Sequence, residues 1–341
     1  PPQPIRAGSG PQPGHALEDS MNNFQLWRRR SVLLAGLGLA GASLHNLASR
    51  PEADTSAPAT DTPGSTSQVQ PNNDRKPAGG PLKLGWSAWA DAEVVSLMAT
   101  QLIESELNQP VERVMADIGI QYQSVARGDL DLMLMAWLPG THRDYWSKVR
   151  DRVLDLGPMY SGRLGWIVPD YVPEEVIASI EQLQDPQLAD RFDGRVQGID
   201  PGSGLNQASL KALKQYGLTS MELVASSSAA MAAVLAQAID EQRWLIATSW
   251  TPHWMFARYK LRFLDDPKGS FGATERIHAV ARQGLDQLHP AVTAFLSRFH
   301  LPESDLDGLL LQAQESSAET AVSTYLARHP NRVRYWTTGE I

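Results

Sequence analysis

The chain of 341 residues is long enough for two structural units. Its 42% hydrophobic and 20% charged residues are typical of a soluble globular protein rather than a bundle of membrane helices. Residues 81–341 carry 23 basic and 32 acidic side chains, which argues against a nucleic acid or an anionic lipid surface as partner. Cysteine is absent, which excludes disulfides, thiolate catalysis and cysteine-ligated metals, whereas 10 tryptophans outnumber the 8 tyrosines and 7 phenylalanines.

The first 80 residues differ in composition from the rest of the chain. Residues 1–20 are rich in proline and glycine and precede the first methionine, so we expect an upstream or disordered segment. Residues 21–48 join three arginines to an apolar run too short to span a bilayer. This predicts an export signal of the twin-arginine or general secretory type, cleaved or kept as an N-terminal anchor. Residues 49–80 have almost no large apolar side chains and predict a disordered linker.

From residue 81 onward, short apolar runs alternate with segments of helical period. The expected strands are Leu82–Trp86, Val114–Ala116, Leu132–Ala136, Leu164–Val168, Val196–Ile199, Leu223–Ala225 and Leu245–Thr248. The expected helices are Ala92–Leu107, Ile120–Arg127, Pro173–Leu183, Gln207–Tyr216, Ser228–Glu241, Pro290–Arg298, Glu303–Ala313 and Ala318–Arg328. This alternation predicts an α/β fold with mainly parallel sheets.

A glycine-rich turn, GIDPGSGLN at residues 198–206, joins a predicted strand to a predicted helix. The free amide groups at a helix N-terminus attract anions. Gly202 and Gly204 would let the backbone approach a ligand, and Ser203 could cap the helix. The turn is therefore a candidate carboxylate site, and a simple tight turn without a ligand is the alternative.

Tryptophans follow three of the predicted strands, where open α/β sheets bind ligands. Trp250 and Trp254 lie in SWTPHW, Trp137 in AWLPGTH, and Trp86 and Trp89 in WSAWADAE. Any one of them alone would more often be core packing. If several converge, their ring faces attract a cation without hydrogen bonds, each contact contributing about 0.5 to 2 kcal/mol, which suits a methylated ammonium group. A solute with such a cation at one end and a carboxylate at the other would fit both features.

Histidines near these motifs allow two interpretations. His142, beside the expected anion pocket, could donate a hydrogen bond to a carboxylate. A small hydrolase would instead use Ser203 as nucleophile and His142 or His253 as base. However, Ser203 lies in Pro-Gly-Ser-Gly-Leu and not in the Gly-x-Ser-x-Gly elbow. The histidines show no paired metal-ligand spacing. We therefore expect no enzyme, no cofactor and no metal.

The stretches GIDPGSG, SSAAM, SWTPHWMFARYKLRFLDDPK and AWLPGTH resemble the substrate-binding proteins of glycine betaine ABC importers over about residues 82–340. The resemblance implies a cage of three tryptophans around the ammonium group. It also implies a carboxylate held by two backbone amides and a histidine. The matching cage positions are Trp89, Trp137 and Trp250, and the matching carboxylate ligands are Gly204, Leu205 and His142.

One departure from that family concerns the first tryptophan. The family often reads Trp-Asp-Ser-Glu where this chain has Trp89 followed by Ala-Asp-Ala-Glu, so Trp86 stays open as an alternative to Trp89. Behind the cage we expect a supporting layer of side chains, namely Trp86, Ser203, His253 and Trp254.

The resemblance further implies a type II periplasmic-binding-protein-like clamp with two hinge crossings, near Trp166 and Phe263. Lobe 1 would comprise residues 81–166 plus 263–341 and lobe 2 residues 167–262. The implied protein is exported and periplasmic, and delivers glycine betaine or a similar small zwitterion to permease and ATPase subunits encoded elsewhere. Choline, carnitine, proline betaine and dimethylsulfoniopropionate stay open as solutes, and so does a receptor role without a transporter.

Overall fold

The computed structural model describes residues 80–341. The expected upstream segment, the export signal and the linker up to residue 79 lie outside the described residues. Within the described part, no helix is both long enough and apolar enough to cross a membrane.

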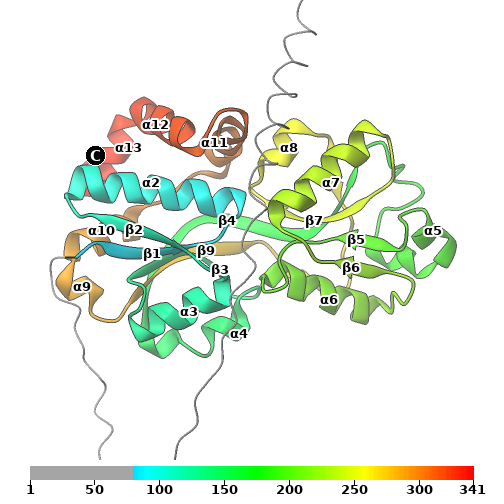
Figure 1. The fold of residues 1–341 in the computed structure, drawn as a ribbon, viewed down its shortest axis with the longest axis horizontal. Coiled ribbons are helices and arrows are strands. Elements are labelled where there is room, and N and C mark those ends of the chain that lie inside the picture. Colours follow the sequence, from blue (N-terminus) through cyan, green and yellow to red (C-terminus); the bar gives the residue numbers. More distant parts are fainter. Residues whose placement is uncertain (1–79) are drawn as a thin grey trace, which may run out of the picture. The chain divides into compact units, whose positions relative to one another are not determined.

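The N-terminal part of the described chain and strand β9 from its C-terminal part build a mixed sheet with helices on both faces (Figure 1). Its strand order is β2 (Val111–Met115), β1 (Leu82–Trp86), β3 (Leu132–Leu138), β9 (Glu275–Arg282) and the first part of β4 (Val153–Pro169). Strand β1 runs parallel to β2 and β3, whereas β9 runs antiparallel to β3 and β4. All seven residues of β3 are buried, as expected for a strand covered on both faces.

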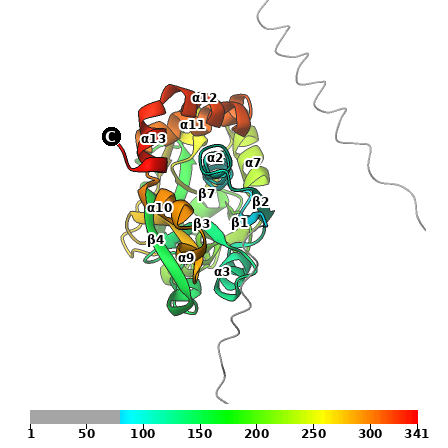
Figure 2. The same ribbon diagram turned by 90° about the vertical axis from the view of Figure 1, so that its left-hand side faces the viewer.

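Helix α2 (Ala90–Leu107) covers one face of this sheet, and α3 (Ile118–Arg127) covers the other. Three C-terminal helices lie over α2 in both ribbon views (Figure 2), namely α11 (Glu303–Glu315), α12 (Ala318–Arg328) and α13 (Pro330–Thr338). Helix α10 (Pro290–Arg298) packs beside the sheet against β4 and α13. Because α2 is covered by both the sheet and these helices, eleven of its residues are buried.

A second sheet is built from the middle of the chain. It consists of the second part of β4, then β7 (Ile246–Thr251), β5 (Arg195–Gln197) and β6 (Glu222–Val224), with β8 (Leu261–Phe263) paired to β4. Helices α7 (Ser228–Asp240) and α8 (Trp254–Arg258) lie on one side and α6 (Gly204–Tyr216) on the other. Smaller elements complete the chain: α4 (Arg143–Trp146), η1 (Arg150–Arg152), η2 (Ile180–Gln184), α5 (Pro186–Asp190) and α9 (Leu285–Leu288).

Strand β4 belongs to both sheets and forms one of the two crossings between them. It pairs with β9 as far as Gly162 and with β7 from Arg163 onward. The chain returns between β8 and β9, over residues 264–274. Residues 80–341 thus form two α/β lobes joined by two crossings, which confirms the expected architecture. The lobe limits near Trp166 and Phe263 stay a prediction; the change of pairing on β4 falls a few residues before Trp166.

Three details differ from the sequence-based expectations. Four of the eight strand pairings are antiparallel, so the sheets are mixed rather than mainly parallel. The helix expected at Pro173–Leu183 is reduced to the short 3₁₀ helix η2. Within the range expected to be helical, the buried residues Ile177, Ile180 and Leu183 recur every three positions, which is the period of a 3₁₀ helix. Strands β8 and β9, the first half of β4 and helix α13 were not expected.

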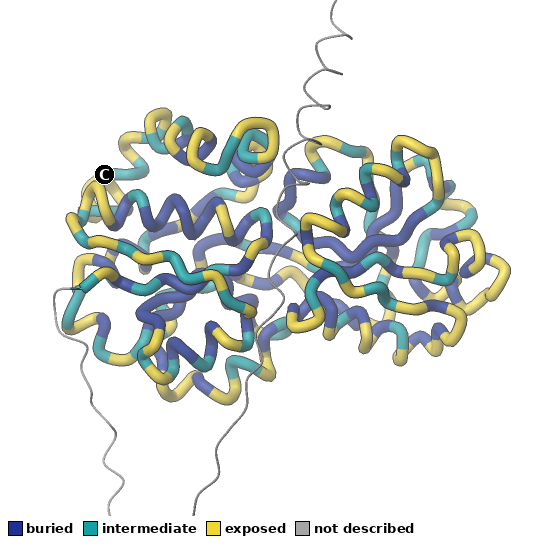
Figure 3. The backbone as a smooth tube through the Cα atoms, viewed as in Figure 1, coloured by how far each residue is buried: buried dark blue, intermediate teal, exposed yellow. Residues whose placement is uncertain are grey.

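The buried backbone follows the inner strands of both sheets and the inner faces of the helices (Figure 3), whereas β2, β6 and β8 contain no buried residue. Buried backbone also continues where the two sheets meet on β4, whose residues Met159, Tyr160, Trp166 and Ile167 are all at most 1% exposed. The ends of β3 and β7 therefore reach the junction of the lobes inside a desolvated environment.

Candidate functional site

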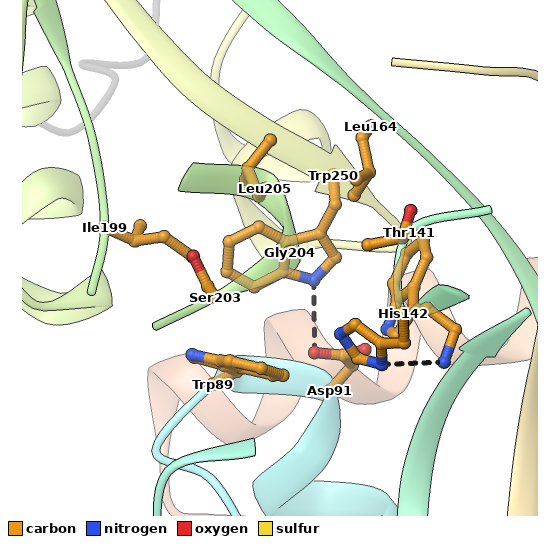
Figure 4. A pocket seen from close by; sticks show the side chains of 11 residues that line it. Trp89, Asp91, Thr141, His142, Leu164, Ile199, Ser203, Gly204, Leu205 and Trp250 are labelled. Carbon is orange, nitrogen blue, oxygen red and sulfur yellow. Dashed lines mark hydrogen bonds between the residues drawn. The ribbon is translucent and has the colours of Figure 1, made fainter. Parts of the chain in front are cut away.

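A pocket that is partly open to solvent lies at the junction of the two lobes (Figure 4), with about 310 Å³ of empty space including that solvent. The residues that line it are Trp89, Asp91, Trp137, Thr141, His142, Leu164, Ile199, Ser203, Gly204, Leu205 and Trp250. All six residues expected to contact a ligand are among them, and so is Ser203.

The three expected cage tryptophans reach the pocket from separate elements. Trp89 is the N-cap of α2, Trp137 lies near the end of β3, and Trp250 lies on β7. Their exposed fractions are 7%, 4% and 3%, so each ring is almost fully removed from water. Trp86 is not part of the pocket lining and faces the guanidinium group of Arg113, 5.3 Å from its ring centroid.

Two aspartates accept hydrogen bonds from two of these three indoles. The Nε1–H of Trp250 donates to Oδ1 of Asp91 at 3.1 Å, and the Nε1–H of Trp89 donates to Oδ2 of Asp200 at 3.0 Å. Asp91 also accepts from the hydroxyl of Tyr160 at 2.7 Å. Burial raises the pKa of Asp91 and of Asp200, because desolvation disfavours the carboxylate form.

His142 presents a hydrogen-bond donor to the pocket. Its Nδ1 accepts the backbone N–H of Trp137 at 3.1 Å, so in the neutral ring the proton is on Nε2. Figure 4 shows the other ring nitrogen pointing toward the space between Trp250 and Ser203. Burial lowers the pKa of His142 to about 3, so the ring is a neutral donor at ordinary pH.

His253 and Trp254 lie behind Trp250 and do not line the pocket. The ring of His253 stands edge-on to Trp250, with centroids 4.6 Å apart and an interplanar angle of 86°. Its Nδ1 accepts the backbone N–H of Met255 at 3.2 Å and thereby caps α8. Trp254 packs on the far side of His253, with centroids 5.4 Å apart. These two residues therefore hold the ring of Trp250 in place.

The N-terminus of α6 lies at the pocket, which Ser203, Gly204 and Leu205 line. Ser203 caps the helix by accepting the N–H of Asn206 at 3.1 Å. Gly204 and Leu205 follow as the first helical residues, whose amide groups have no partner inside a helix. A β-carbon on Gly204 would lie 2.3 Å from Cγ2 of Thr141, so only glycine allows the helix to approach the loop that carries His142.

That loop is fixed by Glu275, at the start of β9. The carboxylate, which is 6% exposed, accepts the backbone N–H groups of Gly140 at 3.0 Å and Thr141 at 2.9 Å. It also accepts the hydroxyl of Thr141 at 2.7 Å. The position of His142 thus depends on an acidic side chain 134 residues away from Thr141 along the chain.

Sequence reasoning did not predict five residues that line or shape the pocket, namely Asp91, Thr141, Leu164, Ile199 and Glu275. Asp91 and Thr141 lie inside the quoted motifs, and an acidic residue two positions after Trp89 was a usable signal. Leu164 and Ile199 look like ordinary strand residues. No sequence pattern near Glu275 indicates that it accepts hydrogen bonds from Gly140 and Thr141.

An aromatic pocket between two lobes joined by two crossings defines a solute-binding protein with the type II periplasmic-binding-protein fold. The chain belongs to the family of substrate-binding domains of ABC-type glycine betaine transport systems (OpuAC), which matches residues 80–328. Members of this family are solute-binding proteins and not enzymes. Among residues 80–341, no group of three or more His, Asp or Glu side chains could hold a metal ion.

Individual relatives agree with this assignment. GbuC of Listeria monocytogenes, a glycine betaine/carnitine transport binding protein, is 35% identical over 155 residues, covering 45% of this chain and 52% of GbuC, so the match spans about half of that relative. A glycine betaine/proline betaine-binding periplasmic protein of Salmonella typhimurium is 23% identical over 300 residues, covering 77% and 86%. Lactococcal OpuAC, solved closed and complexed with glycine betaine, superposes with a TM-score of 0.70 at 33% identity, covering 76% of this chain and 99% of its own.

Proposed function

We propose that this protein captures glycine betaine, or a close relative, in the pocket between its lobes and delivers it to an ABC importer. The observation that carries the proposal is the convergence of Trp89, Trp137 and Trp250 in one buried pocket that also contains hydrogen-bond donors. Three ring faces suit a trimethylammonium group, which has no N–H to donate. GbuC, a glycine betaine/carnitine transport binding protein, and lactococcal OpuAC, solved with glycine betaine, support the same solute class.

The donors lie so that they would orient the other end of the solute. The Nε2–H of His142 and the amide groups of Gly204 and Leu205 would bind a carboxylate, which accepts several hydrogen bonds at once. Choline would leave those donors poorly paired because it offers only a hydroxyl. We therefore rank glycine betaine before choline, with carnitine, proline betaine and dimethylsulfoniopropionate as further candidates.

Delivery would require a membrane permease and an ATPase encoded by other chains. We place the protein outside the cytoplasm, in agreement with the family and with the periplasmic relative of Salmonella typhimurium. A tether by an uncleaved N-terminal segment is the finer form of this proposal. Fractionation of cells separates the two forms, because a free protein is released with the periplasm and a tethered one stays with the membranes.

The first test is isothermal titration of the chain with glycine betaine, then with choline and carnitine. We expect one-to-one binding of glycine betaine and weaker binding of choline. Trp137→Ala and Trp250→Ala should each weaken binding at least about tenfold, because each loses a cation–π contact and buried ring surface. Trp86→Ala is the matched control and should bind as the unchanged protein does. Absence of binding to every methylated cation would overturn the proposal.

A further inference from the structure

Two hydrogen bonds cross between the lobes in opposite directions, and each involves a cage tryptophan. Trp89 of the first lobe donates to Asp200 of the second, with distances of 3.0 and 3.4 Å to the two carboxylate oxygens. Trp250 of the second lobe donates to Asp91 of the first at 3.1 Å. Each lobe thus supplies one tryptophan and the aspartate that holds the other lobe's tryptophan.

We infer that Asp91 and Asp200 are positioning residues that complete the cage only when the two lobes meet. This inference rests on the proposed function and deepens it. The indole N–H is the only polar group of tryptophan, so an acceptor that binds it fixes the rotation of the ring. The direction of the ring face in turn decides how well it attracts a cation. Closure of the lobes and alignment of the cage are therefore one event.

The two aspartates differ in the charge that they bring to the cage. Asp91 is fully buried, lines the pocket itself and accepts a second hydrogen bond, from Tyr160. Its partners are neutral, so a methylated cation in the pocket would supply the countercharge that a buried carboxylate otherwise lacks. Asp200 is partly buried and lies at the mouth of the cleft, together with the exposed Asp117. Asp91 would therefore favour cations, whereas Asp200 mainly holds Trp89.

A third contact between the lobes offers a matched control. The hydroxyl of Tyr145 donates to the carbonyl oxygen of Gly202 at 2.9 Å and accepts from the side-chain amide of Gln207 at 2.8 Å. This contact bridges the lobes without touching a cage indole. Tyr145→Phe removes it and keeps the ring, which stacks on Tyr122.

The test compares Asp200→Ala, Asp200→Asn, Asp91→Asn and Tyr145→Phe in the full chain. Titrations use glycine betaine and tetramethylammonium, which probes the cage without the carboxylate site. We expect Asp200→Ala to weaken binding of both solutes roughly 10- to 100-fold, the worth of a hydrogen bond to a charged group. Asp200→Asn keeps a hydrogen-bond acceptor for Trp89 and should therefore lose less affinity than Asp200→Ala. Asp91→Asn should weaken tetramethylammonium more than glycine betaine, because the carboxylate of the zwitterion offsets part of the attraction. Tyr145→Phe should change either affinity less than about fivefold, as for two neutral hydrogen bonds at an exposed site.

The second readout is the ¹⁵N–¹H spectrum of the indole groups with saturating glycine betaine, assigned through Trp89→Phe and Trp250→Phe. We expect Asp200→Ala to move the Trp89 resonance and Asp91→Asn to move the Trp250 resonance, each without moving the other. Two results would overturn the inference while leaving the function intact. The first is that the indole resonances of Trp89 and Trp250 do not move in the aspartate variants. The second is that Asp200→Ala binds the solutes as tightly as Tyr145→Phe does. If the unchanged chain binds neither solute, the proposed function fails, and the inference fails with it.

Discussion

A single glycine controls how closely the two halves of the pocket approach each other. A β-carbon on Gly204 would meet Cγ2 of Thr141 at 2.3 Å and Cδ2 of His142 at 3.0 Å, and both neighbours come from the other lobe. The side chain at position 204 is therefore a test of closure rather than of folding.

We predict that Gly204→Ala weakens glycine betaine binding at least about 100-fold, because closure with contacts this short costs a few kcal/mol. The free protein should keep its melting temperature, since alanine is a better helix former than glycine. Gly202→Ala is the control, because no atom lies within 4 Å of its β-carbon. Calorimetric titration and thermal melting measure both quantities, and unchanged affinity in Gly204→Ala would contradict the prediction.

The buried histidines link stability to pH. Burial lowers the pKa of His142 and of His253 to about 3, below the ordinary value of 6.5. Between these values the unfolded chain binds more protons than the folded chain. The free energy of unfolding should therefore fall as the pH drops from about 6.5 toward 3, by on the order of a few kcal/mol per histidine.

Urea unfolding at pH 7 and pH 5 checks this link. We expect His253→Asn to keep the cap of α8, because asparagine is a good N-cap residue, and to lose less stability between the two pH values than the unchanged chain. Comparing the two chains cancels the contribution of other groups, including Asp91. An equal loss of stability in both chains would contradict the assignment.

At the scale of elements, the site depends on β9 as much as on the tryptophan motifs. The first residue of β9 is Glu275, whose carboxylate fixes the loop before His142. An amide at this position would place an NH₂ group against backbone donors, since Gly140 and Thr141 both point N–H groups at it.

We predict that Glu275→Gln weakens glycine betaine binding about tenfold and changes tetramethylammonium binding much less. The reason is that only the carboxylate of glycine betaine would bind His142, and tetramethylammonium has no carboxylate. Glu112→Gln, at an exposed position of β2, is the matched control. Titration with the two solutes measures the difference. Equal losses for both solutes would mean that Glu275 supports the whole pocket and not the carboxylate end.

Elements with strong local signals could be predicted from the sequence, and elements that depend on distant partners could not. Helices α6, α7 and α12 begin at serine caps that bond their own first turns, so their signals are local. Strand β4 contains Gly157, Pro158 and Gly162, which interrupt the apolar pattern of its first half. Trp89, Trp137 and Trp250, which line the pocket, were predicted because their motifs lie at predicted strand ends and match the motifs of the family. Asp91 lies in one of those motifs, but its role as acceptor for Trp250 could not be predicted, because Trp250 is 159 residues away.

At the scale of the whole molecule, the backbone of β4 passes close to the pocket where it crosses between the lobes. A β-carbon on Gly162, the last residue of β4 that pairs with β9, would lie 2.4 Å from the carbonyl oxygen of Thr251 and 2.5 Å from the ring of Trp137. The hinge region is thus packed directly against Trp137, which lines the pocket. A movement of one lobe relative to the other must also move a wall of the pocket.

Ligand-driven closure of the lobes can be measured directly, because the chain has no cysteine of its own. Ala88 and Gly202 are exposed and line the mouth of the cleft from opposite lobes. With spin labels on Ala88→Cys and Gly202→Cys, we expect glycine betaine to shorten and narrow the distance distribution. The physical reason is that a solute held by both lobes binds only the closed state and shifts the population toward it.

A pair within one lobe, Ala88→Cys and Glu112→Cys, is the control for this measurement and should keep its distance distribution when the solute is added. If both pairs stay unchanged at saturating glycine betaine, the lobes are already closed without the solute. Asp200 would then hold Trp89 permanently, and the cage would be preformed rather than assembled by closure. If the pair across the cleft responds and Asp200→Ala abolishes the narrowing, alignment of the cage and closure of the clamp are the same step.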